Sequence, residues 1–168
     1  MPPYKTCAIS IKTAPFAEAD KLVTLFSREF GKIRVIARSA RRVPSRLAGR
    51  VEPFSYADFV IARGRSLDTI SQCEIFETFQ SIRDNPSQLG VGFYLLKLIH
   101  AGTVEGQPNP ELFELLLKAL MVLKAGKDPG LIARRFEKAF LKLEGIYREG
   151  TDPRYSISEH VGVDIRAW

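Results

Sequence analysis

The chain has 168 residues, of which 45% are apolar and 26% are charged, a composition typical of a folded globular protein. Its basic excess lies in the first half, because residues 1–80 have 13 basic and 8 acidic side chains, whereas residues 81–168 have 12 and 11. It contains no run of about 18 apolar residues, and its first residues lack the apolar stretch of a signal peptide, so we expect neither a membrane span nor a leader but a cytoplasmic protein.

The first half of the chain is predicted to form five short β-strands. Apolar and polar residues alternate in residues 5–12, and further strands are predicted over residues 21–27, 32–38, 54–62 and 67–79, the last with an irregularity midway. Residues 13–20, which include Pro15, and the turn at Gly64 are expected to be connections. This series of short strands and hairpin turns indicates a small closed or partly open barrel. Cys7 and Cys73 are expected to be buried thiols rather than a disulfide.

A basic block dominates residues 30–51, which hold seven basic side chains and no acidic one. The block begins as a strand and continues into a loop over residues 39–48 that contains Pro44. Like charges in such a block repel one another, and binding an anion relieves this repulsion, so we favour a nucleic-acid backbone as its ligand. The alternative is a solvated edge that prevents sheets from associating. Its members are Lys32, Arg34, Arg38, Arg41, Arg42, Arg46 and Arg50.

Five aromatic residues lie near the basic block in the sequence or in the predicted barrel. Most aromatic side chains of a small barrel belong to its core, but an exposed ring can stack on a base. The five are Tyr4, Phe16, Phe30, Phe54 and Tyr56.

After Phe79 the hydrophobic period changes from two to 3.6, which predicts helices. Three helices are each expected to begin with a capping residue followed by proline, at Asn85-Pro86, Asn109-Pro110 and Asp128-Pro129. Their apolar stripes suit an antiparallel bundle with short connections, so we predict a barrel domain over residues 1–80 and a helical domain over residues 81–168. From Gly150 onward there is no clear period, which leaves both an ordered and a frayed tail open.

The sequence shows no arrangement typical of a catalytic centre. His100 and His160 are isolated, the chain has no CxxC pair, and no acidic cluster or phosphate-binding glycine loop is present. We therefore expect no catalytic residue, no metal site, no cofactor and no enzymatic activity. Basic residues at positions 134, 138 and 142 recur on one face of the third helix, either as a solvated face or as a docking stripe for an acidic peptide.

Several longer strings occur in a characteristic order. They are FAEADKLVTLFSREFGKIRVIARSARRVPSRLAGRVEPF, ARGRSLDTISQCEIFETFQSIR, NPELFELLLKAL and ARRFEKAFLKLEGI. Together they resemble the bacterial RecO family of DNA recombination and repair proteins over about residues 5–147. The resemblance implies an α+β protein, with an N-terminal five-stranded OB-fold barrel that binds DNA and an all-α helical domain.

The resemblance also implies function and partners. Proteins similar to this chain bind single-stranded and double-stranded DNA, anneal complementary strands, and act with RecR to help RecA replace the single-stranded-DNA-binding protein SSB. Carried over to this sequence, DNA contacts fall on the basic block. Contacts with the acidic, Phe-terminated tail of SSB fall on Arg134, Arg135, Lys138 and Lys142.

The chain departs from the family pattern near its end. Many members continue with a four-cysteine zinc module, which this sequence lacks, so we expect either a naturally short, zinc-free member or a truncated one. Two other functions stay open: a protein-interaction adaptor for RecR or SSB, and a general RNA-binding OB module, because a basic OB face accepts both nucleic acids.

Overall fold

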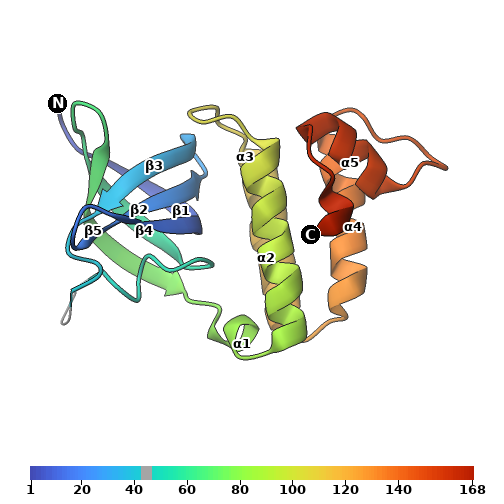
Figure 1. Ribbon diagram of the computed structural model, residues 1–168, viewed down its shortest axis with the longest axis horizontal. Helices are drawn as coiled ribbons and strands as arrows, with labels where there is room; N and C mark the ends of the chain where they lie inside the picture. The colour runs from blue at the N-terminus through green and yellow to red at the C-terminus, as the bar shows by residue number, and fades with distance from the viewer. Residues whose placement is uncertain (43–46) are drawn as a thin grey trace. The chain divides into compact units, whose positions relative to one another are not determined.

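The computed structural model describes residues 1–42 and 47–168 (Figure 1). The chain forms two compact units. The barrel unit comprises Met1–Phe79 together with Thr103–Pro110, and the helical unit comprises Gln80–Gly102 and Glu111–Trp168. A segment from between two helices therefore belongs to the barrel unit, which the sequence did not predict.

In the described part of the barrel unit, five strands close into a barrel in the order β1-β2-β3-β5-β4. Neighbouring strands are antiparallel except β3 and β5, which are parallel. This is the topology of an OB-fold, and the predicted class, a five-stranded barrel followed by helices, is confirmed. The strands are β1 (Tyr4–Phe16), β2 (Asp20–Ser27), β3 (Gly31–Ala37), β4 (Tyr56–Ala62) and β5 (Asp68–Glu77).

Strand β1 is longer than the sequence predicted, because it continues through Pro15 to Phe16. Its pairing explains how proline is accommodated. β2 pairs with β1 as far as Phe16, opposite Asp20, whereas β4 pairs with β1 only from Tyr4 to Ile9. The distal half of β1 is therefore an edge, where proline is tolerated.

The irregularity predicted in the fifth strand is present. In the β4–β5 register, Val60 lies opposite Gln72 but Ile61 lies opposite Ile70, so Ser71 is an extra residue on β5. The bulge keeps Ile61 and Ile70 in the buried core of the barrel. Cys7 and Cys73 are both buried and free, as predicted.

The helical unit contains the three predicted helices and two further α-helices. The observed helices are α1 (Gln80–Arg83), α2 (Pro86–Gly102), α3 (Pro110–Lys124), α4 (Pro129–Leu143) and α5 (Pro153–Val161), followed by the 3₁₀ helix η1 (Ile165–Ala167). Asn85 caps α2, since its side-chain oxygen accepts from the backbone N–H of Ser87 at 3.1 Å and of Gln88 at 3.2 Å. Among the described residues, none of the helices has both the length and the apolarity that a membrane crossing requires.

The C-terminal residues are ordered, which settles the alternative left open by the sequence. Asp152 accepts a hydrogen bond from the backbone N–H of Arg154 at 3.0 Å at the start of α5, and Gly162 ends the helix in the left-handed conformation. Asp152 and Pro153 form the same capping pair that marks the three predicted helices. This signal was missed because α5 has a weak apolar stripe, with Ser156 and Ile157 as its buried residues.

Candidate nucleic-acid interface

Strand β3 distributes its side chains as its alternating sequence predicts. Val35 and Ala37 belong to the buried core of the barrel, and Ile33 packs against it. Lys32 and Arg34 alternate with these residues and therefore lie on the outer face of the strand. The two side chains nevertheless differ in burial, since Lys32 is buried and Arg34 is exposed.

Lys32 is buried, with a relative exposure of 9%. Its ammonium donates a hydrogen bond to the carbonyl of Thr103 at 2.9 Å, and its own carbonyl accepts from the backbone N–H of Gly106 at 2.8 Å. Burial lowers the pKa of the Lys32 ammonium, although Glu105 acts in the opposite direction. The Thr103–Pro110 segment thus covers the first basic residue of the block.

Arg34 is exposed, but it has an internal partner. Its Nε atom lies 3.3 Å from Oε2 of Glu105 and donates to Oε1 at 3.4 Å. Both side chains are half exposed, at 50% and 51%. The arginine therefore faces solvent with part of its charge already balanced.

Residues 38–42 are fixed to the turn between β1 and β2. The backbone N–H of Ser39 donates to Asp20 at 2.8 Å, and the backbone N–H of Arg41 donates to the carbonyl of Ala19 at 2.9 Å. The guanidinium of Arg41 also donates to the carbonyl of Ala17 at 3.2 Å. These bonds hold the exposed side chains of Arg38, Arg41 and Arg42 on one ordered stretch of backbone.

Apolar side chains within the basic block anchor it to the barrel. Ala40, Leu47 and Val51 are buried and belong to the barrel core. The stretch that looks like a mobile basic loop in the sequence is therefore held on both sides of residues 43–46. The apolar positions among the arginines are the sequence signal for this anchoring.

Of the last two members of the block, Arg46 and Arg50, only Arg50 is among the described residues, and Arg46 lies outside them. Arg50 is exposed as a residue, but its guanidinium donates to the carbonyl of Cys73 at 3.1 Å, which ties it to β5. Beyond the block, Lys21 of β2 pairs with Glu52, the acidic residue that ends the run of basic charge.

The aromatic residues near the block divide between core and surface. Phe54 is 1% exposed and belongs to the interior. Tyr4 and Phe30 are partly buried, with ring centroids 4.7 Å apart, and the guanidinium carbon of Arg63 lies 4.5 Å from the Tyr4 centroid. Burial raises the pKa of Tyr4 to about 12, and Asp68, which accepts its hydroxyl hydrogen bond, adds to the shift. Arg63, in the turn after β4, is an exposed cation that lies outside the basic block in the sequence.

The remaining aromatic residues, Phe16 and Tyr56, are also partly buried. Tyr56 accepts a hydrogen bond from the thiol of Cys7 at 3.6 Å, and its ring centroid lies 5.1 Å from that of the exposed Phe76. Its hydroxyl is therefore engaged with β1, and its ring with β5. Base stacking by any of these rings stays a prediction.

The helical unit has an apolar groove between α3 and α4, with a volume of about 250 Å³. Two cations, Lys118 and Arg135, lie at its walls. Its apolar lining consists of Leu115, Ala119, Val122, Ile132, Phe136 and Ala139. The groove therefore combines an apolar floor with positive charge.

The four residues assigned to an acidic peptide do not lie in one place. Arg135 lines the α3–α4 groove, whereas Arg134 lines a second cavity of about 630 Å³ with Glu137 and Arg154. Lys138 and Lys142 lie 5.3 Å and 5.2 Å from the ring centroid of Tyr147. A cation–π contact accounts for both lysines, so their spacing on the helix does not by itself indicate a ligand.

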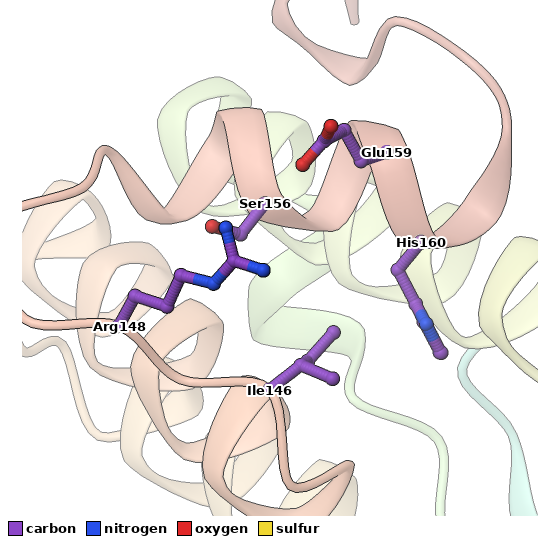
Figure 2. A pocket seen from close by; sticks show the side chains of 5 residues that line it. All are labelled: Ile146, Arg148, Ser156, Glu159 and His160. Carbon is purple, nitrogen blue, oxygen red and sulfur yellow. The ribbon is translucent and has the colours of Figure 1, made fainter.

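A third, smaller cavity has a volume of about 180 Å³. Figure 2 shows the side chains that line it, with Arg148 reaching toward α5. Ser156, Glu159 and His160 line it from the helix, and His160 Nε2 lies 3.6 Å from Oε2 of Glu144. Because Arg148 and Glu159 carry opposite charges, the cavity offers little attraction to a polyanion. Among the described residues, no group of three or more His, Cys, Asp or Glu side chains is arranged to hold a metal ion.

Comparison with known families gives two matches that follow each other along the chain. Residues 1–79 match the family model described as "Recombination protein O N terminal", and residues 83–151 match "Recombination protein O C terminal". The two matches correspond to the barrel and to most of the helices.

Curated relatives are similar over most of this chain. The "DNA repair protein RecO" of Pelotomaculum thermopropionicum is 43% identical over 142 residues, which cover 84% of this chain and 55% of that protein. The proteins of the same name from Desulforamulus reducens and Listeria monocytogenes are 38% and 37% identical over 149 and 139 residues, covering 89% and 83% of this chain. These matches cover 58% and 54% of those relatives, so the chain spans a little over half of their length.

Proposed function

The chain belongs to the RecO family of DNA repair proteins, and from this premise we propose that it is a non-enzymatic, DNA-binding mediator of recombinational repair. In this proposal it binds single-stranded and double-stranded DNA and anneals complementary strands. It acts with RecR to help RecA load on strands that are coated with SSB. Since the chain spans a little over half the length of its relatives, these activities are proposed for the chain itself.

The observation that supports DNA binding most directly is the ordered presentation of Arg38, Arg41 and Arg42. Their backbone is fixed to the β1–β2 turn, so little backbone conformational entropy is lost when they meet a phosphate backbone. Arg34 and Arg63 are further exposed arginines of the same barrel unit. Lys32, buried under the Thr103–Pro110 segment, acts through its field rather than by direct contact.

Annealing places two demands on such a surface. The repulsion between two polyanionic strands must be screened, and the base edges must stay free to pair. Exposed arginines meet the first demand. Contacts with phosphates meet the second, because they position a strand without occupying its Watson–Crick edges.

The test is a salt titration of binding to single-stranded DNA, duplex DNA and RNA of equal length. Affinity is expected to fall with salt at a log–log slope of roughly −0.7 per contacted phosphate on a single strand. The double variant Arg38→Ala/Arg42→Ala should weaken binding and reduce the slope by about 1.4, because two phosphate contacts are lost. Lys124→Ala/Lys127→Ala removes the same charge from exposed positions of the helical unit and should leave the slope unchanged.

An unchanged slope in the arginine variant would place the DNA site elsewhere. Tighter binding to RNA than to either form of DNA would favour the RNA-binding alternative. Both outcomes are readable from the same titration, because the ligands have equal length and the RNA and the single-stranded DNA carry equal charge.

A second function, as an adaptor, is favoured by the α3–α4 groove. An apolar floor flanked by Lys118 and Arg135 suits an acidic peptide that ends in an apolar residue, the description that the family resemblance gives for the SSB tail. In this proposal Arg135 carries the contact with the peptide. The groove and the arginine surface lie in different units, so the two functions can be tested by separate variants.

A further inference from the structure

Within residues 1–42 and 47–168, the pairing of β3 leaves half of one edge without a neighbouring strand. β2 pairs with β3 along its whole length, from Gly31 to Ala37, whereas β5 pairs with it only at Val35 and Ile36. The first half of β3, on the side of β5, is therefore open within the barrel itself. The Thr103–Pro110 segment occupies this place, where Glu105 forms a parallel bridge with Lys32.

The segment is held on both sides of Glu105. Before it, the carbonyl of Thr103 accepts from the Lys32 ammonium, and after it, the N–H of Gly106 donates to the Lys32 carbonyl. Close approach also depends on Gly31, where an added Cβ would lie 2.2 Å from the carbonyl oxygen of Gln107. The backbone of Glu105 is thus positioned by the strand that presents Arg34.

The carboxylate of Glu105 occupies the place at Arg34 that a phosphate would take. Both of its oxygens lie close to Nε of the arginine, at 3.3 Å and 3.4 Å, and a guanidinium group binds carboxylates and phosphates alike through charge-assisted N–H···O bonds. Because both side chains are half exposed, the pair is weak and a polyanion can displace the carboxylate.

We propose that Glu105 is an internal competitor for DNA at Arg34, and that it lowers the affinity of the barrel for single strands. This inference rests on the proposed DNA-binding function and adds a regulatory residue to that site. When DNA binds, a phosphate replaces the Glu105 carboxylate, so the ion pair that Arg34 loses offsets part of the free energy of its contact with the phosphate. A surface of this kind holds DNA less tightly, which suits a protein that must release its strands after pairing them.

The test uses the full chain and a fluorescent oligothymidylate, with affinity measured over a range of salt concentrations. Glu105→Gln keeps the shape of the side chain and removes its charge. It should tighten binding by about two- to fivefold at low salt, as loss of an exposed ion pair allows. It should also make the salt slope steeper, because salt screens the Arg34–Glu105 pair of the wild type and the gain therefore shrinks as salt rises.

Two controls separate competition from a general effect of charge. Glu149→Gln removes the same charge from an exposed position in the helical unit and should change neither quantity. In an Arg34→Ala background, Glu105→Gln should have no effect beyond that of Glu149→Gln, because the site of competition is absent.

The outcomes distinguish this inference from the proposed function. Wild-type binding combined with an unchanged Glu105→Gln variant overturns the inference alone. Equal tightening with and without Arg34 also overturns it, since the effect would then be long-range repulsion. Absence of DNA binding by the wild type at every salt concentration overturns the proposed function, and the inference with it.

Discussion

The hydroxyl of Tyr94 in α2 donates a hydrogen bond to the carboxylate of Glu137 in α4, which is only 4% exposed. Arg154 of α5 completes the cluster, with its Nε atom 3.9 Å from Oε2 of Glu137. A buried carboxylate is tolerated when hydrogen bonds and an opposite charge replace its hydration. These three side chains connect three helices, so their contribution to the stability of the helical unit can be tested by substitution.

Replacing Tyr94 by Phe should destabilise the chain by about 1–3 kcal/mol, because the buried carboxylate loses a donor and nothing replaces it. Urea unfolding measures the change. Tyr155→Phe is the matched control, since that tyrosine is 47% exposed and its hydroxyl lies 3.4 Å from Glu159. Equal effects of the two substitutions would show that the Tyr94 bond does not stabilise the fold.

The same cluster predicts a dependence of stability on pH. Burial raises the pKa of Glu137 above the ordinary value of a glutamate, although Tyr94 and Arg154 oppose the shift. Between the pKa of the unfolded chain and that of the folded chain, the folded state binds more protons. The free energy of unfolding therefore falls as pH rises through this window, and the penalty is constant above it.

Glu137→Gln isolates this contribution, because the amide does not titrate. The stability of the wild type minus that of the variant should decrease as pH rises from the ordinary glutamate range, as measured by urea unfolding in pH steps. Glu159→Gln, on the exposed side of α5, serves as the control for a general loss of charge. A difference that stays flat or increases with pH would contradict the assignment.

Gly31→Ala should destabilise the barrel unit by about 2 kcal/mol or more. Gly31 has φ of +71°, which costs an L-residue about 1–2 kcal/mol, and the added Cβ would also collide with the carbonyl of Gln107. Thermal unfolding of the variant measures the loss. The control is Gly49→Ala, because a Cβ at Gly49 meets no atom within 4 Å, and its stability should be unchanged or slightly greater.

The chain alone should accelerate pairing of complementary oligonucleotides without nucleotide or metal, and less so at high salt, because screening weakens the attraction between arginines and phosphates. Fluorescence quenching follows the pairing. The variant Arg38→Ala/Arg42→Ala should slow it, whereas Lys124→Ala/Lys127→Ala should not. Pairing no faster than in buffer, without DNA binding, would favour the adaptor function.

Arg135→Ala should weaken binding of an acidic peptide ending in Phe by roughly tenfold, since a charge-assisted hydrogen bond is lost. Calorimetric titration with the full chain measures the affinity. Lys142→Ala is the control, because Lys142 lies over Tyr147 rather than in the α3–α4 groove. Weaker binding by Arg134→Ala but not by Arg135→Ala would move the peptide to the larger cavity.

Local patterns in the sequence determined most of the elements and the basic surface. Alternation along residues 32–38 placed Val35 and Ala37 inside the barrel, and the capping pairs at Asn85 and Asp128 located the helix starts. The first signal depends on the periodicity of side chains along a strand, and the second on the unpaired N–H groups at the start of a helix. Both effects act over only a few residues. The same reasoning would have found α5 at Asp152-Pro153, where a weak apolar stripe concealed it.

Only the tertiary structure decided which basic residues are available to a ligand. Lys32 and Arg34 are equivalent in the alternating pattern, yet one is buried against Thr103 and the other is paired with Glu105, about 70 residues further along the chain. That outcome follows from the incomplete pairing of β3 with β5, which leaves backbone groups of β3 to be satisfied by a distant segment. Closure of the barrel determines this pairing. It therefore cannot be predicted from the periodicity of residues 30–51.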